Sequence, residues 1–275
     1  MPFLKIIRPV NGLFTVLCVF FGAFYLKNIT FSMPIFFAAL SAFFISTAGY
    51  VINDFFDIEI DMINRPDRIL PSKQISPKVA YIYALILFVL GLLASVLTQN
   101  KFCILIAFIN TILLFYYAKY FKKTFLLGNV IVAFAAGSTF IFGALANSNL
   151  LFGTIPAFFA FLYTLIRELI KDAEDVDGDK KLNAKTIPVL LGKVAAIYFS
   201  IIPFAIMLWL STYYNSRQIF PIHTVIAMNI LVNIPFTYYL IKLRFNLAKE
   251  QFSKTSKFIK FDMLILLLVL LTALI

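Results

Sequence analysis

Long apolar runs alternate with short polar connections along the whole chain. A run of about 17 or more residues with almost no charge is typical of a membrane-spanning helix. Apolar residues make up 62% of the 275 residues and charged residues 13%, whereas soluble domains are about half apolar and a quarter charged. The pattern predicts an all-α polytopic membrane protein, a single domain over residues 1–275. The nine predicted spans are 10–26, 33–52, 79–97, 102–118, 126–146, 150–166, 194–213, 221–241 and 259–275.

The basic residues are distributed unevenly between the connections of these spans. If the N-terminus is cytoplasmic, 21 of the 24 lysines and arginines fall on the cytoplasmic side, and only Lys27, Lys101 and Arg217 fall on the other. This asymmetry is the one that the positive-inside rule describes. The net charge of +11 therefore reflects topology in the cell membrane, plasma or inner. We expect contacts with membrane lipids and no nucleic-acid partner.

The acidic residues, in contrast, gather in two short segments. Eleven of the 13 carboxylates lie between Asp54 and Asp67 or between Glu168 and Asp179. These segments follow the second and the sixth predicted spans, on the cytoplasmic side. The same spacing recurs in both, because each aspartate of the second set stands 118 positions after its counterpart in the first. The two sets are Asp54, Asp57 and Asp61, then Asp172, Asp175 and Asp179.

This repeated spacing predicts that each set shares one face of a helix. Steps of three and four residues, at ~100° per residue, bring the side chains onto the same side. Like charges at such spacing repel unless cations lie between them, and hard divalent cations such as Mg²⁺ take oxygen ligands. A duplicated motif four helices apart also suggests two related halves that meet at a central cavity. Small residues in the 126–146 span, including Gly137, Ser138 and Gly143, predict close helix packing.

Two Mg²⁺ ions and several cationic side chains suit one particular substrate, the diphosphate ester of an apolar alcohol. The ions would bind the diphosphate oxygens, and lysines and arginines would contact the others. As the carbon–oxygen bond breaks, negative charge grows on the diphosphate, where these cations stabilise it. The carbon side becomes an allylic cation that must be kept from water. A cavity that opens at the membrane surface would accept a polar head with an apolar tail.

The motifs resemble those of the UbiA family of membrane prenyltransferases. The resemblance rests on Asn53, Asp54, Asp57 and Asp61, on the later Asp175 and Asp179, and on their places after the second and sixth of nine spans. The segments Arg8–Asn11 and Tyr117–Lys123 are similar to further landmarks of the family. Segments 64–72, 167–179 and 185–188 resemble most the digeranylgeranylglyceryl phosphate synthase branch. That branch transfers a geranylgeranyl group to the hydroxyl of geranylgeranylglyceryl phosphate in ether-lipid synthesis.

The resemblance implies roles for matching residues of this chain. Catalytic roles would fall to five aspartates, which are Asp54, Asp57, Asp61, Asp175 and Asp179. One Mg²⁺ would be held by Asn53, Asp54, Asp57 and Asp61, and a second by Asp172, Asp175 and Asp179. The residues expected to bind substrate are Asn11, Arg65, Arg68, Tyr117, Lys122, Arg167 and Lys171. For Arg167 and Lys171, ordinary positive-inside placement is an equal alternative.

Two other functions would also use part of this pattern. The resemblance leaves open an aromatic acceptor, such as 4-hydroxybenzoate or another quinone precursor, in place of the lipid-like acceptor. A magnesium channel would also need carboxylates, but it should carry them at depth along a pathway. Here they gather at one membrane boundary. The sequence therefore favours a Mg²⁺-dependent prenyltransferase that uses a prenyl diphosphate, expected to be geranylgeranyl diphosphate.

Overall fold

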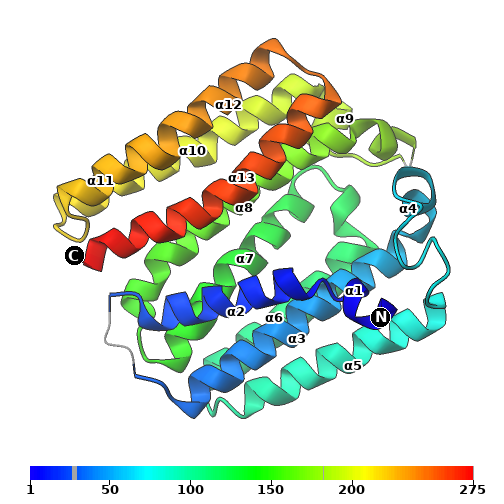
Figure 1. Ribbon diagram of the computed structural model, residues 1–275, viewed down its shortest axis with the longest axis horizontal. Coiled ribbons are helices and arrows are strands. Elements are labelled where there is room, and N and C mark those ends of the chain that lie inside the picture. Colours follow the sequence, from blue (N-terminus) through cyan, green and yellow to red (C-terminus); the bar gives the residue numbers. More distant parts are fainter. Residues whose placement is uncertain (27–29, 182, 275) are drawn as a thin grey trace. The chain divides into compact units, whose positions relative to one another are not determined.

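The computed structural model describes residues 1–26, 30–181 and 183–274 (Figure 1), and every regular element in those ranges is a helix. In the N-terminal part, the helices are α1 (Pro2–Ile6), α2 (Pro9–Phe24), α3 (Met33–Phe56), α4 (Ile58–Asn64), α5 (Pro77–Val96), α6 (Lys101–Lys119), η1 (Phe121–Lys123) and α7 (Leu127–Ala146). They are followed by α8 (Leu150–Lys181), α9 (Ile187–Leu191), α10 (Lys193–Ser216), α11 (Ile222–Met228), η2 (Asn229–Asn233), α12 (Ile234–Phe245), α13 (Lys249–Leu271) and η3 (Thr272–Leu274). The predicted all-α class is confirmed for the described residues.

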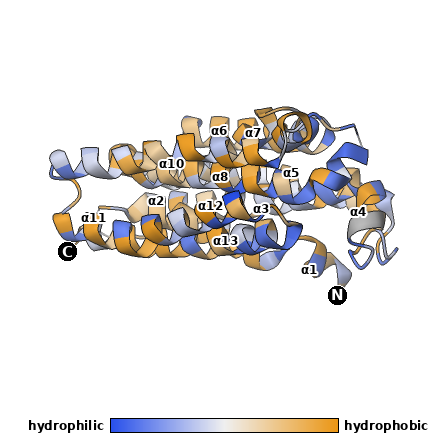
Figure 2. Cartoon of the chain, turned by 90° about the horizontal axis from the view of Figure 1, so that it is seen from above, coloured by the Kyte–Doolittle hydropathy of each residue, from blue (hydrophilic) through white to orange (hydrophobic). Residues whose placement is uncertain are grey.

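Each of the nine predicted spans falls on a helix or, for 221–241, on the stretch from α11 to α12. Among the described residues, seven helices could cross a membrane by length and composition. They are α3, α5, α6, α7, α8, α10 and the combined stretch Ile222–Phe245. Figure 2 shows hydrophobic residues over most of the long helices, while hydrophilic residues gather around α4. The chain is therefore an integral membrane protein.

The remaining two predicted spans fall on α2 and α13. The 16 residues of α2 extend over only about 24 Å at ~1.5 Å per residue, less than the ~30 Å hydrocarbon core. The first half of α13 carries four lysines, and its apolar half begins only after Asp262. The count of nine spans stays a prediction. Lys27, expected on the side opposite to most basic residues, lies outside the described residues.

The chain divides into two compact units, and the boundary passes within α7 and α8. The first unit comprises Met1–Lys122 and Phe134–Ala157, and the second comprises Lys123–Ala133 and Phe158–Ile275. Each acidic motif belongs to a different unit.

In the first unit, α3 is the central helix and contacts α2, α5 and α6. Small residues on α3, such as Ala38, Ala42 and Ala48, are buried among residues of these neighbours. The helices α2 and α7 approach still more closely, since a Cβ added to Gly143 would lie 1.8 Å from the carbonyl oxygen of Val19. A Cβ added to Gly22 would lie 2.0 Å from the carbonyl oxygen of Phe140. The close packing predicted for the 126–146 span is present.

In the second unit, α10, α11, α12 and α13 pack against one another. Their core is aromatic: Phe204 lies 4.7 Å from Phe236 between ring centroids, and Phe236 lies 5.8 Å from Tyr163 of α8. The hydroxyl of Tyr163 donates a hydrogen bond to the buried Asp262 of α13. This bond fixes α13 to the helix that carries the second acidic motif.

Candidate active site

The first acidic motif spans a break between two helices. Asn53 and Asp54 end α3, and Asp61 lies in the short helix α4. Asp57 lies between them, at φ −96° and ψ 3°, and is both the C-cap residue of α3 and the N-cap residue of α4. The helical pattern of backbone hydrogen bonds continues through the break. Asp57 N donates to Asn53 O at 3.0 Å, and Asp61 N donates to Asp57 O at 2.8 Å. The side chains therefore keep nearly helical spacing.

Arg68 holds two of these carboxylates together. Its Nη1 donates to Asp61 Oδ2 at 2.6 Å and to Asp54 Oδ1 at 3.3 Å. Both aspartates are buried, at 7% and 5% exposure for Asp54 and Asp61. Since one guanidinium nitrogen reaches both, Asp54 and Asp61 face the same side of the chain. Buried carboxylates require such cationic partners, because an unpaired buried charge is costly.

Asp54 has a second cationic partner, Arg8, whose Nη2 lies 2.5 Å from Asp54 Oδ1. Arg8 caps the start of α2 in a left-handed conformation, at φ 51° and ψ 64°. Its guanidinium also lies over the ring of Tyr50, at 5.2 Å from the centroid. No individual role was predicted for Arg8, although it begins one of the segments that resemble the family.

Asp57 pairs with a different cation, Lys122 of η1. It also accepts a hydrogen bond from the amide of Asn53, at 2.7 Å. Three residues predicted from the sequence, Asn53, Asp57 and Lys122, therefore meet in the structure. Together with Arg8, Asp54, Asp61 and Arg68, they form what we call the first acidic network.

The other substrate-binding candidates of the first unit are Arg65, Asn11 and Tyr117. Arg65 caps the end of α4 and is exposed. Asn11 is in the first turn of α2, and Tyr117 is near the end of α6; both are half-buried. Their predicted contacts with substrate stay predictions.

The second acidic motif lies on one continuous helix, because α8 runs for 32 residues from Leu150 to Lys181. Asp172, Asp175 and Asp179 therefore share a face of α8 at helical spacing. The amide of Asn129 donates to Asp172 Oδ2 at 2.7 Å, and the hydroxyl of Thr186 donates to Asp179 Oδ2 at 3.2 Å. These two partners were absent from the sequence prediction.

Glu168 organises the two basic residues predicted on α8. It is buried, at 5% exposure, and accepts from Arg167 Nη1 at 2.9 Å and from Lys171 Nζ at 3.0 Å. Sequence reasoning placed Glu168 in the motif without a role. The i, i+3 spacing of Glu168 and Lys171 could have indicated this pair.

Among the residues that the structure describes, no three His, Cys, Asp or Glu side chains converge into a metal-binding group. The donor set nevertheless suits Mg²⁺, which usually takes one or two carboxylates and keeps several waters. Asp54 and Asp61 already converge on one positive charge, and Asp57 and Asn53 supply further oxygens. Residues of each motif thus offer hard oxygen donors beside cationic side chains, an arrangement that suits a diphosphate.

Comparison with known proteins agrees with this chemistry. The sequence profile of the UbiA prenyltransferase family matches residues 15–261. A digeranylgeranylglyceryl phosphate synthase from Methanosphaera stadtmanae is 38% identical over 264 residues, 96% of this chain and 96% of its own. A solved structure described as a digeranylgeranylglyceryl phosphate synthase in membranes is 34% identical, with a TM-score of 0.78, and the match covers 99% of this chain and 97% of the other.

A second solved structure, a UbiA homolog from Archaeoglobus fulgidus bound to GPP and Mg²⁺, has a TM-score of 0.68. The match covers 97% of this chain and 99% of that one. At 20% identity, this likeness concerns the fold.

Proposed function

Because this chain belongs to the UbiA prenyltransferase family and is therefore an enzyme that transfers prenyl groups, we propose the following reaction. A geranylgeranyl group passes from geranylgeranyl diphosphate to the hydroxyl of geranylgeranylglyceryl phosphate, in ether-lipid synthesis. The observation that carries the choice of acceptor is the 38% identity to a digeranylgeranylglyceryl phosphate synthase over 96% of both chains.

The reaction exchanges one carbon–oxygen bond for another. The bond between the allylic carbon and the diphosphate oxygen breaks, and the diphosphate leaves with the electron pair. The acceptor oxygen forms a bond to that carbon, and its proton is released. Mg²⁺, when bound, neutralises the negative charge that accumulates on the diphosphate. The protein must hold the metal ions, bind the diphosphate and exclude water from the carbon cation.

The residues proposed for these roles come from both units. We assign Asn53, Asp54, Asp57 and Asp61 to one Mg²⁺, and Asp172, Asp175 and Asp179 to the other. Arg68 and Lys122 are already paired with the first set, so binding of a metal would free their positive charges for the diphosphate or the acceptor's phosphate. Asn11, Arg65 and Tyr117 complete the proposed substrate contacts.

Arg167 and Lys171 have an analogous place in the second unit. Their pairing with Glu168 holds two cationic side chains on α8, with Lys171 about one turn and Arg167 about two turns before Asp175. We propose that they contact phosphate oxygens of a substrate. Glu168 orients them, because buried charge pairs fix side-chain positions even where they add little stability.

The proposal includes a topology for the whole chain. Residues 1–275 form one prenyltransferase domain of nine spans around a central cavity, in the cell membrane. The N-terminus and both acidic motifs face the cytoplasm, in line with the distribution of basic residues. The two motifs then line the cytoplasmic mouth of the cavity, where a prenyl diphosphate can place its head at the surface and its chain among apolar side chains.

A transfer assay tests the substrate assignment. The purified protein is incubated in detergent with Mg²⁺ and radiolabelled geranylgeranyl diphosphate, and geranylgeranylglyceryl phosphate or 4-hydroxybenzoate is offered in parallel. We expect label to enter the lipid acceptor alone. Transfer only to the aromatic acid would refute the acceptor assignment. If neither acceptor were labelled and no diphosphate were released, the proposed reaction would be wrong.

A further inference from the structure

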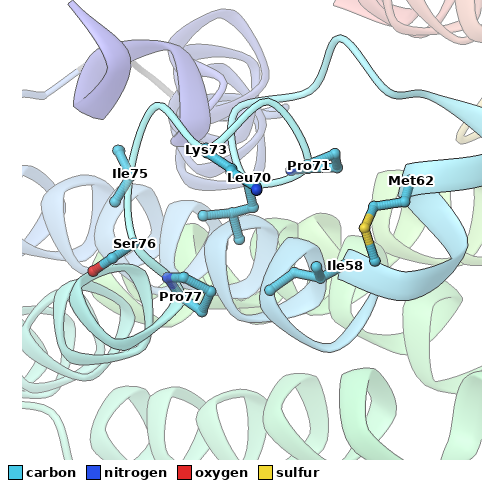
Figure 3. A pocket seen from close by; sticks show the side chains of 8 residues that line it. All are labelled: Ile58, Met62, Leu70, Pro71, Lys73, Ile75, Ser76 and Pro77. Atoms are coloured by element: carbon cyan, nitrogen blue, oxygen red, sulfur yellow. The ribbon is translucent and has the colours of Figure 1, made fainter.

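A hollow of about 360 Å³ lies beside α4, and none of its lining residues belongs to the first acidic network. Figure 3 shows side chains from α4, from the connection after it and from the start of α5 around this hollow. The lining residues are Ile58, Met62, Leu70, Pro71, Lys73, Ile75, Ser76 and Pro77. All belong to the first unit, and the volume lies within the range of small-molecule sites.

The helix α4 borders both the first acidic network and the hollow. Asp61 faces Arg68 and is buried. Ile58 and Met62, which are four residues apart and therefore neighbours on the helix surface, face the hollow. Met62 is 53% exposed although it is apolar. The hollow and the acidic network thus share α4 as a common wall.

The opposite wall is a tight turn that also begins at the acidic network. Arg68 binds Asp54 and Asp61, and its carbonyl accepts from Ser72 N at 2.9 Å. Lys73 N donates to Leu70 O at 3.0 Å, and Lys73 adopts a left-handed conformation at φ 58°. These bonds place the Lys73 side chain at the edge of the hollow, while Leu70 forms part of its buried floor.

The position of the hollow relative to the long helices indicates what fills it. It lies just after the end of α3 at Phe56 and includes Pro77, the first residue of α5. Both helices are long and apolar enough to cross a membrane. Six of the eight lining residues are apolar, so the hollow offers hydrocarbon contact at the level where two spans end.

The charge at this hollow is positive. Lys73 is the one charged residue of the lining and is exposed. In the described part of the chain, no ion pair is recorded between Lys73 and a carboxylate. A lysine beside the membrane surface attracts anionic headgroups. The ligand that complements these features has an apolar chain and a negative headgroup.

We propose that this hollow binds an anionic phospholipid of the surrounding bilayer, with one hydrocarbon chain against Ile58 and Met62 and the phosphate beside Lys73. The lipid then supports α4 and the turn that follows Arg68. This site shares no residue with the proposed substrate site, since none of the residues assigned to the diphosphate, the acceptor or the metal lines the hollow. The proposal does not depend on the identity of the prenyl acceptor.

Quenching by brominated lipids tests the proposal directly. Trp209 is the only tryptophan, so Trp209→Phe provides a silent background, and Met62→Trp places an indole at the hollow. The protein is reconstituted in a zwitterionic bilayer with increasing fractions of chain-brominated phosphatidylglycerol or chain-brominated phosphatidylcholine. We expect the anionic lipid to quench this indole at a lower fraction. Val89→Trp, at an exposed position on α5, should be quenched equally by both lipids.

Variants of the lysine establish the role of the headgroup. Lys73→Asn removes the charge and keeps a residue that tolerates the left-handed conformation. It should raise the fraction of phosphatidylglycerol needed for half-maximal quenching about fivefold, which corresponds to ~1 kcal/mol for one surface lysine. Lys73→Arg should retain the preference. Lys78→Gln is the matched control, since Lys78 lies in the same region but does not line the hollow.

Several results would overturn the proposal. Equal quenching of the indole at position 62 by both lipids would show that the headgroup is not selected. If the preference for phosphatidylglycerol persisted in Lys73→Asn, Lys73 would not bind the headgroup. If Lys78→Gln reduced the preference as much as Lys73→Asn does, general surface charge would be its cause. Native mass spectrometry of the unsubstituted protein provides a second measurement, and it should show more phosphatidylglycerol retained than in Lys73→Asn. Equal retention would also contradict the site.

Discussion

Removal of Arg68 should destabilise the metal-free protein more than removal of Arg8, although both bind Asp54. Arg68→Met takes away the recorded ion-pair partner of Asp61 and one of the two partners of Asp54. Arg8→Met leaves Asp54 with Arg68, at 3.3 Å. The two variants thus differ in whether a buried carboxylate loses its cation.

The magnitude follows from the exposure of these groups. Breaking a fully buried pair by removing one partner costs about 3–5 kcal/mol. The Arg68 side chain is 23% exposed and that of Asp61 is 7% exposed, so solvent reduces the cost, and we expect about 2–3 kcal/mol for Arg68→Met. For Arg8→Met, whose side chain is 31% exposed, we expect about 1 kcal/mol.

The measurement is reversible unfolding in mixed micelles with a chelator present, followed by titration with Mg²⁺. If the carboxylates hold the metal, Mg²⁺ should restore more stability to Arg68→Met than it adds to the unsubstituted protein, because a cation replaces the lost charge. Equal losses in the two variants would refute the account of the first acidic network. A Mg²⁺ response identical to that of the unsubstituted protein would contradict the metal assignment.

Three further predictions concern packing and the second motif. Gly143→Ala and Gly22→Ala should each lower the free energy of unfolding by about 2 kcal/mol, because the added Cβ would lie within 2.0 Å of backbone atoms. Gly49→Ala should be tolerated in the same unfolding assay, because its Cβ would contact only the Leu114 side chain, at 3.1 Å. Asp175→Asn should lower turnover about a hundredfold or more at unchanged yield in membranes, while its neighbour variant Glu174→Gln stays active; full activity of Asp175→Asn would remove it from the metal site. Asn129→Ala removes the 2.7 Å hydrogen bond to Asp172 and should weaken Mg²⁺ binding about tenfold, measured by calorimetry with diphosphate present; an unchanged affinity would show that Asn129 does not orient a ligand.

The sequence predicted most of the helices because their apolar runs are long and uninterrupted. All nine predicted ranges fall on helical stretches, and α8 continues from the 150–166 span through the second motif. The sequence predicted less well where individual helices end. The break at Asp57 divides the first motif between α3 and α4, and no glycine or proline marks it. A turn at this point depends on tertiary contacts that the local sequence does not contain.

The sequence predicted the acidic residues of the site but only some of the residues that pair with them. Helical spacing alone identifies which aspartates share a face, so both triads could be found. Arg8 and Asp54 are 46 positions apart, and Asn129 and Asp172 are 43 apart. Such pairs depend on how helices pack, and no local pattern specifies them. Lys122 was expected to contact a phosphate group, and in the structure it pairs with Asp57. Metal binding to Asp57 would break this ion pair and leave Lys122 available for the phosphate.

In the proposed reaction, both acidic motifs bind the same diphosphate through their metal ions. Electron paramagnetic resonance of the Mn²⁺-substituted protein with geranylgeranyl diphosphate tests this arrangement, because two ions bridged by one diphosphate are magnetically coupled. We expect a coupled two-ion spectrum that reverts to a single-ion spectrum in Asp61→Asn and in Asp175→Asn. Two uncoupled ions in the unsubstituted protein, or a coupled spectrum that survives both substitutions, would contradict the claim.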